Sequence, residues 1–393
     1  MDYRTLDRLD LRRKRVLLRV DFNVPLDKRT GRRITSDTRI RKALPTVRAA
    51  IDENCSLVIA SHLGRPNGRP NPRMSLAPVA ERLSELLGRP VGMAPDCIGA
   101  ETEAMAAGLR AGEVLLLENL RFHPEEQAND RTFAHRLASL ADVFVNDAFG
   151  TAHREHASTV GVTEFAQERA AGLLMQREME HLSMAVSQPR HPYVAIIGGA
   201  KISGKIDVIR NLLTLADTVL IGGAMTYTFL KALGIGTGAS LVEGEKVGLA
   251  RDLLAQAGDR IKLPADHVVA DSFSATAATR TVRGAIPEGW MGLDIGPETV
   301  GEYGALISQA RMIVWNGPMG VFELDPFAAG TIAVARAVDR TSTGSVSIVG
   351  GGDSERAIRK AGVGRNITHI STGGGASLDL LGGSVLPGIA ALC

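Results

Sequence analysis

The sequence lacks the features that mark membrane-spanning, secreted and nucleic-acid-binding proteins. No stretch approaches the apolar run of about eighteen residues that a membrane-spanning helix needs, and the opening MDYRTLDRLD is charged, unlike a signal peptide. The 45 Lys and Arg nearly balance the 43 Asp and Glu, so the net charge is +2. This balance gives no general reason to expect nucleic acid or a membrane surface as a partner. We therefore expect a soluble, cytoplasmic protein.

Cysteine is also scarce. Cys55, Cys97 and Cys393 are far apart, odd in number and without a CxxC pair. They predict no disulfide framework and suit a reducing cytosol. His153 and His156 form an HxxH, but no third ligand stands near them at metal spacing. For at least one of these histidines we favour contact with an anion over a zinc site.

The length and the order of apolar runs predict the fold class. At 393 residues the chain exceeds what one hydrophobic core usually supports, so two domains are expected. Short apolar runs alternate with longer amphipathic segments, which predicts parallel sheets covered by helices. The expected strands are VLLRVDF, SLVIASH, EVLLLEN and VFVNDAF in the first half, and YVAIIGG, TVLIGGA, MIVWNGP, SVSIVGG and ITHIST in the second.

Between these halves, residues 163–189 have a helical pattern that Pro189 closes. We predict an α/β fold of two doubly wound, Rossmann-like domains, 1–170 and 191–376, joined by a long hinge helix at 171–190. Ser75 can cap one of the expected helices and Gly88 can end it, and Pro326 can open another.

Polar and basic residues follow the strands of the first half. In open parallel sheets, ligands bind beyond the carboxyl ends of the strands, and a guanidinium group pairs bidentately with phosphate or carboxylate. A small, highly anionic ligand is therefore predicted. The residues at these positions are Asp21, Asn23, His62, Arg65, Arg121 and Arg154, with Arg39 near the start of the first helix.

The strands of the second half end in glycines instead, in GGAK, IGGAM, WNGPMG and GGGDSE. The last segment predicts a turn whose amides approach a phosphate closely, followed by Asp353 and Ser354 at the N-cap of a helix. Asp353 is either an ordinary cap or a residue close to magnesium. Together the four segments indicate a nucleotide bound with Mg²⁺, and the two halves together suggest phosphoryl transfer.

The segment GGAKISGKI leaves three interpretations open. Gly199, Gly204 and Lys205 match the spacing of a Walker A loop, but Ile206 stands where that motif requires Ser or Thr. The alternatives are a strand-to-helix turn with solvated lysines, and a phosphate loop in which Lys201 is the working residue.

Eight segments in order resemble the signature segments of the phosphoglycerate kinase family. They are RVDFNVP, SHLGRP, ENLRFHPEE, VNDAFGTAHREHAST, GGAKISGKI, WNGPMGVFE, GGGDS and ISTGGGASL, and they span nearly the whole chain. The resemblance implies reversible phosphoryl transfer between ATP and the carboxylate of 3-phosphoglycerate, giving 1,3-bisphosphoglycerate and ADP. This sequence departs from the family pattern at two positions. It has Gly204 where the family usually has Asp, and Glu155 where the family often has a small residue.

The resemblance also implies the roles of particular residues. Phosphoglycerate would be held by Asp21, Asn23, Arg39, His62, Arg65, Arg121 and Arg154. The nucleotide would be held by Lys201, Lys205, Asn316, Glu323, Gly351, Gly352, Asp353 and Ser354, with Asp353 near Mg²⁺. The segment 377–393 would return to the N-terminal domain.

The expected chemistry needs no general base, because the attacking carboxylate is already ionised at neutral pH. Charge stabilisation remains, and we assign it to Lys201 and Arg39 as catalytic residues. We expect a monomer that binds neither nucleic acid nor membrane. The alternative is a non-catalytic two-domain protein that binds a small anion and a nucleotide. A dinucleotide-dependent dehydrogenase is disfavoured, since neither half opens with GxGxxG.

Overall fold

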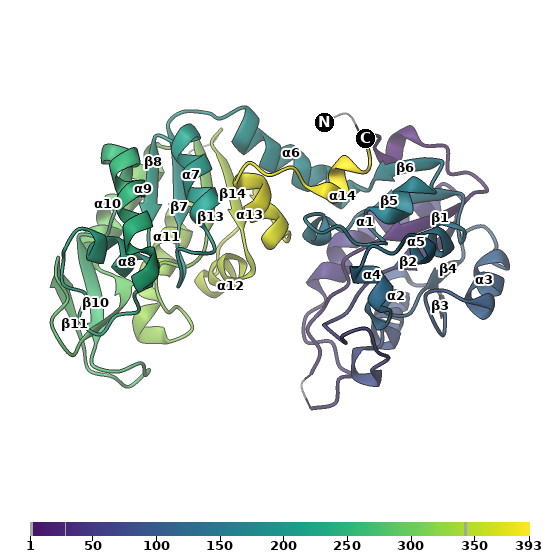
Figure 1. Cartoon of the computed structure of the whole chain (residues 1–393), viewed down its shortest axis with the longest axis horizontal. Helices are drawn as coiled ribbons and strands as arrows, with labels where there is room; N and C mark the ends of the chain where they lie inside the picture. The colour runs from purple at the N-terminus through teal and green to yellow at the C-terminus, as the bar shows by residue number, and fades with distance from the viewer. Residues whose placement is uncertain (1–2, 28, 342–343) are drawn as a thin grey trace. The chain divides into compact units, whose positions relative to one another are not determined.

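The computed structural model describes residues 3–27, 29–341 and 344–393 (Figure 1). Contacts divide the chain into two compact units. The first unit runs to Glu180 and also includes Val385–Cys393, and the second is His181–Ser384. In the described residues, no helix is both long and apolar enough to cross a bilayer.

The first unit contains a parallel sheet whose strand order is β3-β4-β2-β1-β5-β6. Both faces of its central strands are buried, as the continuous apolar runs predict. The strands are β1 (Arg15–Arg19), β2 (Ser56–Ala60), β3 (Val91–Met93), β4 (Val114–Leu116), β5 (Val143–Asn146) and β6 (Glu168–Ala171).

Helices lie on both faces of this sheet. The helices of this unit are α1 (Thr38–Asp52), α2 (Ala77–Leu87), α3 (Ala100–Ala107), α4 (Pro124–Gln127), α5 (Arg131–Ala138) and α14 (Pro387–Ala390). The helix α6 (Leu173–Ser187) begins in this unit and continues into the second from His181. Val16 and Leu18 of β1 join one core with Ile40 of α1 and Leu83 of α2. Leu17 points to the opposite face, where it lies near α5. The period-two alternation of β1 therefore gives each layer of helices its own apolar contact.

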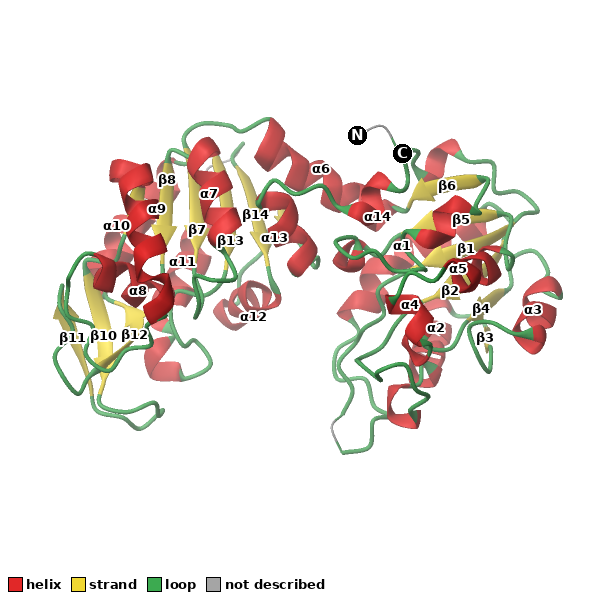
Figure 2. Ribbon diagram, viewed as in Figure 1, coloured by secondary structure: helices red, strands yellow, loops and turns green. Residues whose placement is uncertain are grey.

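The second unit has its own parallel sheet, ordered β15-β14-β13-β7-β8-β9. Its strands are β7 (Tyr193–Ile197), β8 (Thr218–Ile221), β9 (Ile261–Lys262), β13 (Met312–Asn316), β14 (Val346–Gly350) and β15 (His369–Ile370). The helices are α7 (Ile206–Leu215), α8 (Met225–Ala232), α9 (Val247–Ala257), α10 (Pro297–Gln309), α11 (Ala329–Asp339), α12 (Gly352–Ala361) and α13 (Gly375–Leu381). Figure 2 shows helices on both faces of this sheet. Trp315, fully buried, anchors the core beneath α10, α11 and α12.

A small antiparallel sheet in the second unit was not predicted. It has the order β11-β10-β12, from β10 (Asp266–Ala270), β11 (Thr279–Arg283) and β12 (Met291–Ile295). Most of β11 is exposed, so its residues form no apolar run. A search for buried parallel strands therefore misses this sheet.

The nine strands that the apolar runs predict are confirmed, and the α/β class with two doubly wound parallel sheets is confirmed with them. Gly88 ends α2 in the left-handed conformation, as expected. Ser75 is not the N-cap, because α2 begins at Ala77 with Leu76 as its N-cap; the hydroxyl of Ser75 accepts a hydrogen bond from the amide of Ala77 at 3.1 Å. Pro326 lies instead in a 3₁₀ turn, Asp325–Phe327, and α11 begins only at Ala329.

Two boundaries differ from those expected from the pattern. The helical pattern of 163–189 begins too early, because residues 168–171 pair with β5 as the strand β6, and α6 starts at Leu173. Small apolar residues such as Ala170 and Ala171 suit a buried strand as well as a helix. The segment that returns to the first unit starts at Val385, later than Ser377, because α13 packs against α7 in the second unit.

Candidate active site

The loop after β1 carries a carboxylate that positions an arginine. Asp21 forms an ion pair with Arg39 of α1, and His62 Nε2 lies 4.0 Å from the other oxygen of Asp21. Burial alone would raise the pKa of Asp21, but His62, Arg39 and the amide of Asn23 outweigh it and lower that pKa to about 2. Asp21 is therefore an anion at neutral pH and holds Arg39 at the carboxyl edge of the sheet.

His62, which follows β2, is buried and neutral. Burial lowers its pKa well below the ordinary value, although Asp21 opposes this. Arg19 Nη2 lies 3.3 Å from His62 Nδ1. Because a guanidinium group can only donate, Nδ1 accepts and the ring proton stays on Nε2. His62 thus offers an N–H group on the side of Asp21.

Arg121, which follows β4, has buried donors without acceptors. Its side chain is 4% exposed, and Nη1 donates to the carbonyl of Gly64 at 2.8 Å. Among the described residues, Nε and Nη2 have no hydrogen-bond partner. Burial lowers the pKa of Arg121 to about 10, and repulsion from Arg154 and Arg19 adds to this effect. Unpaired buried donors are costly, so this guanidinium group is arranged for an acceptor that a ligand can supply.

A buried network beneath these residues is not evident from the sequence, because its members are far apart in the chain. Arg19 of β1 is fully buried, and its Nε donates to Ser158 Oγ at 2.8 Å. Ser158 Oγ donates in turn to Glu126 Oε1 at 2.6 Å. Burial would raise the pKa of Glu126, but His156, Arg19 and Ser158 outweigh it and lower that pKa. The signal that was available is the arginine within the apolar run VLLRV.

The remaining predicted residues of this group are less firmly held. Asn23 Oδ1 accepts a hydrogen bond from the amide of Gly64 at 2.9 Å, which ties the loop after β1 to the loop that carries the exposed Arg65. Arg154 is half-buried, with Nε 3.2 Å from His153 Nε2. His156 Nδ1 lies 3.7 Å from the carboxylate of Glu126, so this histidine faces a carboxylate of the protein itself.

In the second unit, a carboxylate that the sequence analysis did not identify holds the lysine loop. Glu243 accepts hydrogen bonds from the amide of Ile202 at 2.5 Å and from the hydroxyl of Ser203 at 2.6 Å. Burial would raise the pKa of Glu243, but these hydrogen bonds and Lys201 lower it. Lys201 is exposed at the start of this loop. The loop therefore presents one lysine to solvent while Glu243 fixes its backbone.

Lys205, at the other end of the loop, forms its hydrogen bonds within the protein. Its Nζ donates to Gly198 O at 2.6 Å, to Asn316 O at 3.0 Å and to Asn316 Oδ1 at 2.5 Å. These bonds use all three protons of the ammonium group. Asn316 Nδ2 donates to Gly350 O at 3.1 Å. The carboxyl ends of β7, β13 and β14 are thereby joined, and the structure brings Lys205 and Asn316 together.

Close backbone contacts explain one of the glycines at these strand ends. Gly317 has φ +94°, and a Cβ there would overlap the carbonyl of Gly198 and the ammonium group of Lys205. Its amide donates to Ser354 Oγ at 2.7 Å. Ser354 thus links the loop after β13 to the start of α12.

The start of α12 differs in detail from the expected cap. The N-cap is Gly351, at φ 92°, and no side chain caps the helix. Asp353 and Ser354 therefore lie within its first turn, because a left-handed residue is needed where the chain turns out of β14. The Asp353 carboxylate is exposed and pairs with Arg356 at 2.7 Å, and Arg356 also reaches Glu323 at 3.2 Å. The structure thus brings Asp353 and Glu323 to the same arginine.

A basic site with free buried donors on one parallel α/β unit, and glycine-lined strand ends with lysines on the other, define a class of two-unit α/β proteins suited to phosphorylated ligands. The family model of phosphoglycerate kinase matches residues 6–384. The chain belongs to this family, and so to the kinases.

Individual relatives match over the full length. The phosphoglycerate kinase of Solibacter usitatus (strain Ellin6076) is 55% identical over 394 residues, and that of Chlorobium chlorochromatii (strain CaD3) is 57% identical over 397 residues; each match covers 100% of both chains. The solved structure of phosphoglycerate kinase from Coxiella burnetii superposes with a TM-score of 0.89 at 40% identity, covering 100% of this chain and 99% of that one.

Proposed function

We propose that this protein transfers a phosphoryl group reversibly between ATP and the carboxylate of 3-phosphoglycerate, giving 1,3-bisphosphoglycerate and ADP. Membership of the family supports the reaction as a whole. At the level of residues, the observation that carries the proposal is the buried guanidinium group of Arg121, with two donors that lack an acceptor. A phosphate or carboxylate supplies what those donors need.

On the first unit, phosphoglycerate is held by Asp21, Asn23, Arg39, His62, Arg65, Arg121 and Arg154. Support comes from the contacts around Asp21, which fix Arg39 and place the neutral His62 beside it. Arg121 adds donors in a region of reduced solvent, where ion pairs are stronger. Arg65, which is exposed, is the member of this set that can adjust most freely to the ligand.

On the second unit, the nucleotide is held by Lys201, Lys205, Asn316, Glu323, Gly351, Gly352, Asp353 and Ser354. The start of α12 supplies amides to a phosphate. Lys205 acts mainly through its charge, because its protons are already donated within the protein. Lys201, exposed and flanked by the fixed backbone of its loop, is free to contact the transferring group.

Magnesium fits the residues at the start of α12. Mg²⁺ prefers oxygen ligands and is bound through one or two carboxylates together with substrate phosphates. The exposed carboxylate of Asp353, which pairs with the same arginine as that of Glu323, offers such a ligand. When bound with the nucleotide, the ion neutralises charge on the phosphate oxygens.

The catalytic contribution of the protein is positioning and charge stabilisation. The acceptor carboxylate is ionised at neutral pH, so no side chain has to remove a proton. Lys201 and Arg39 are the catalytic residues, because they bring positive charge to the migrating phosphoryl group. One such well-placed donor contributes about 3 to 4 kcal/mol to lowering the barrier.

Transfer between ligands on different units requires the units to approach each other, and α6 is the hinge that we propose. We further infer a cytoplasmic monomer. Small-angle scattering with 3-phosphoglycerate and ATP together should give a smaller radius of gyration than with either ligand alone. An unchanged radius would count against a closing step.

The reaction itself is tested with 3-phosphoglycerate, ATP and Mg²⁺ in an assay coupled to reduction of the bisphosphoglycerate formed. Activity should require all three components and should be abolished by EDTA. Arg121→Met should lose activity at low phosphoglycerate concentration, while Arg110→Met, at an exposed arginine with 88% side-chain exposure, should not. A folded protein without activity would move the conclusion to a relative that binds its ligands without transferring phosphate.

A further inference from the structure

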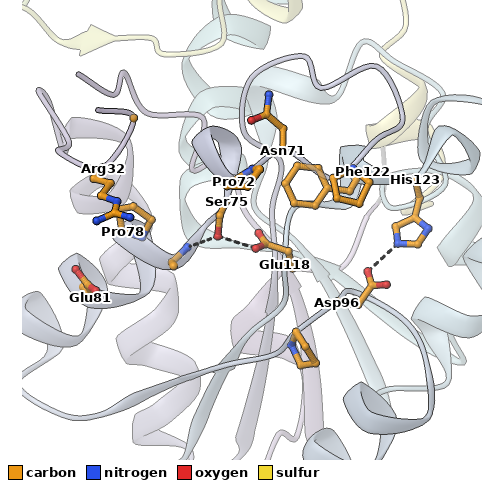
Figure 3. Close-up of a pocket in the computed structure, with 14 residues that line it drawn as sticks. Arg32, Asn71, Pro72, Ser75, Pro78, Glu81, Asp96, Glu118, Phe122 and His123 are labelled. Carbon is orange, nitrogen blue, oxygen red and sulfur yellow. Dashed lines mark hydrogen bonds and ion pairs between the residues drawn. The ribbon is translucent and has the colours of Figure 1, made fainter. Parts of the chain in front are cut away.

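A cavity of about 680 Å³ lies in the first unit, lined by residues that follow β3 and β4 and by the segment around the start of α2. Its walls include Asn71, Ser75, Asp96, Glu118, Phe122 and His123 (Figure 3). Among the described residues that line it, none is predicted to hold phosphoglycerate. The cavity is therefore a separate feature of this unit, which the proposed reaction does not use.

Three side chains with metal-binding atoms meet beside this cavity, which Asp96 and His123 line and behind which Cys97 is buried. Each of Asp96, Cys97 and His123 offers one ligand atom, and these atoms lie within 4.8 Å of one another. His123 Nε2 is 2.7 Å from Asp96 Oδ1, and Figure 3 shows the two side chains pointing at each other. Asp96 follows β3 and His123 follows the turn Leu120–Phe122, so the tertiary fold brings them together.

We propose that Asp96, Cys97 and His123 form a binding site for a transition metal ion of the zinc class, with one coordination position open to the cavity. A thiolate, an imidazole and a carboxylate are the ligand types that zinc takes in proteins. Three protein ligands with a fourth position left to water or a small anion are typical of open zinc sites.

The distances require modest movement. Bonds of roughly 2.0 to 2.3 Å in a tetrahedral arrangement place ligand atoms about 3.3 to 3.8 Å apart. The Asp96–His123 pair therefore opens by about 1 Å to admit the ion. Both side chains can move, since they are 44% and 24% exposed, and both line the cavity through which the ion would enter.

The backbone around these ligands is already held. Thr102 Oγ1 donates to the carbonyl of Asp96 at 3.0 Å, and the amide of Cys97 donates to Asp96 Oδ1 at 2.6 Å. The ring of His123 lies against Phe133, with centroids 5.3 Å apart. Rotation of side chains is therefore the adjustment that binding requires, and the two loops keep their positions.

Binding exchanges a proton for the metal ion. Cys97 is fully buried, and a cysteine binds a metal ion as its thiolate, so the thiol proton has to leave. The S–H bond breaks as the S–metal bond forms, and the proton leaves to water. The dication then balances the carboxylate and the thiolate, and its affinity falls as the pH falls.

Cobalt(II) is the probe for this site, because a cobalt–thiolate bond gives a charge-transfer band in the near ultraviolet. The full chain carrying Cys393→Ser is used, which removes the exposed thiol. The band should saturate at about one equivalent of cobalt and disappear on addition of Zn²⁺. Cys97→Ser should abolish it. Cys55→Ser, at a buried cysteine whose sulfur contacts the carbonyl of Ala50, is the matched control and should leave it intact.

Two further variants keep the test decisive if Cys97→Ser fails to fold. Asp96→Asn and His123→Asn should each weaken cobalt binding by about tenfold or more. Unchanged affinity in either variant would overturn the site. It would equally be overturned by the absence of a band in the Cys393→Ser protein, or by a band that survives in Cys97→Ser. These readouts do not depend on kinase activity.

Discussion

The two units differ in which groups they leave available to bind an anion. In the first unit, side chains offer the hydrogen-bond donors: Arg121 has buried donors without acceptors, and an ionic network around Arg19 and Glu126 supports it. In the second, the lysine that looks most like a phosphate ligand, Lys205, is saturated by the protein. There, backbone amides and the exposed Lys201 are left to face a ligand. The free donors of Arg121 suit the binding role proposed for it, whereas the three hydrogen bonds of Lys205 stabilise the fold.

The largest expected effect concerns the exposed lysine. If Lys201 has the proposed role, Lys201→Ala should lower kcat by about 100 to 1,000-fold, because the substitution removes the charge proposed to stabilise the transferring phosphoryl group. Calorimetry should show nearly unchanged binding of 3-phosphoglycerate, which belongs to the other unit. The control is Lys231→Ala, at an exposed lysine of α8. Near-normal turnover of Lys201→Ala would remove this residue from the mechanism.

The second prediction compares the two buried cations directly. Lys205→Met should lower the free energy of unfolding by about 2 to 3 kcal/mol, since it leaves three oxygens without their donor. Arg121→Met should change the free energy of unfolding by less than about 1 kcal/mol, yet weaken phosphoglycerate binding by about 10 to 100-fold, the value of a charged hydrogen bond. Denaturant titration and calorimetry measure the two quantities. Equal destabilisation by both substitutions would break the distinction between the units.

The third prediction concerns the backbone of the second unit. Gly317→Ala should cost about 1 to 3 kcal/mol in stability, because the position combines a positive φ with close backbone neighbours. Gly204→Ala is the matched control: a Cβ at Gly204 meets nothing within 4 Å. Thermal unfolding of the two variants gives the comparison. A tolerated Gly317→Ala would mean that these loops are less tightly packed than the structure indicates.

The last prediction concerns the pH dependence that a buried carboxyl group contributes; its effect is small in any one pH unit. Burial raises the pKa of Asp147 to about 7, although hydrogen bonds from Thr46, Met175 and Leu174 oppose this. Its ordinary value is 3.8, so the folded state binds the extra proton between these values. The contribution of Asp147 to the free energy of unfolding should therefore fall as pH rises from about 4 to 7, by at most about 1.4 kcal/mol per pH unit. Asp147→Asn should flatten this slope in denaturant titrations; an unchanged slope would assign it to another group.

Local patterns were enough to predict nine strands of the two parallel sheets and the residues at their ends, but the short strands β3, β6 and β9 carry no long apolar run and were not predicted. Apolar runs such as YVAII have few alternatives in a chain of this composition, because a buried parallel strand needs continuous apolar side chains. The antiparallel sheet around β11 was missed because an exposed strand has no such run. The early start of the connecting helix was wrong because small residues suit either conformation.

The sequence by itself determined the fold class, the strand ends and the types of side chain at them, since these depend on periodicity and on the carboxyl-edge rule for parallel sheets. Only the tertiary structure decided which charged side chains have hydrogen-bond partners within the protein. Lys205 meets Asn316 across 111 positions, and Arg19 meets Ser158 across 139. Such partners are chosen by strand order and loop packing, and the free energy of a buried charge depends on those partners more than on its own identity.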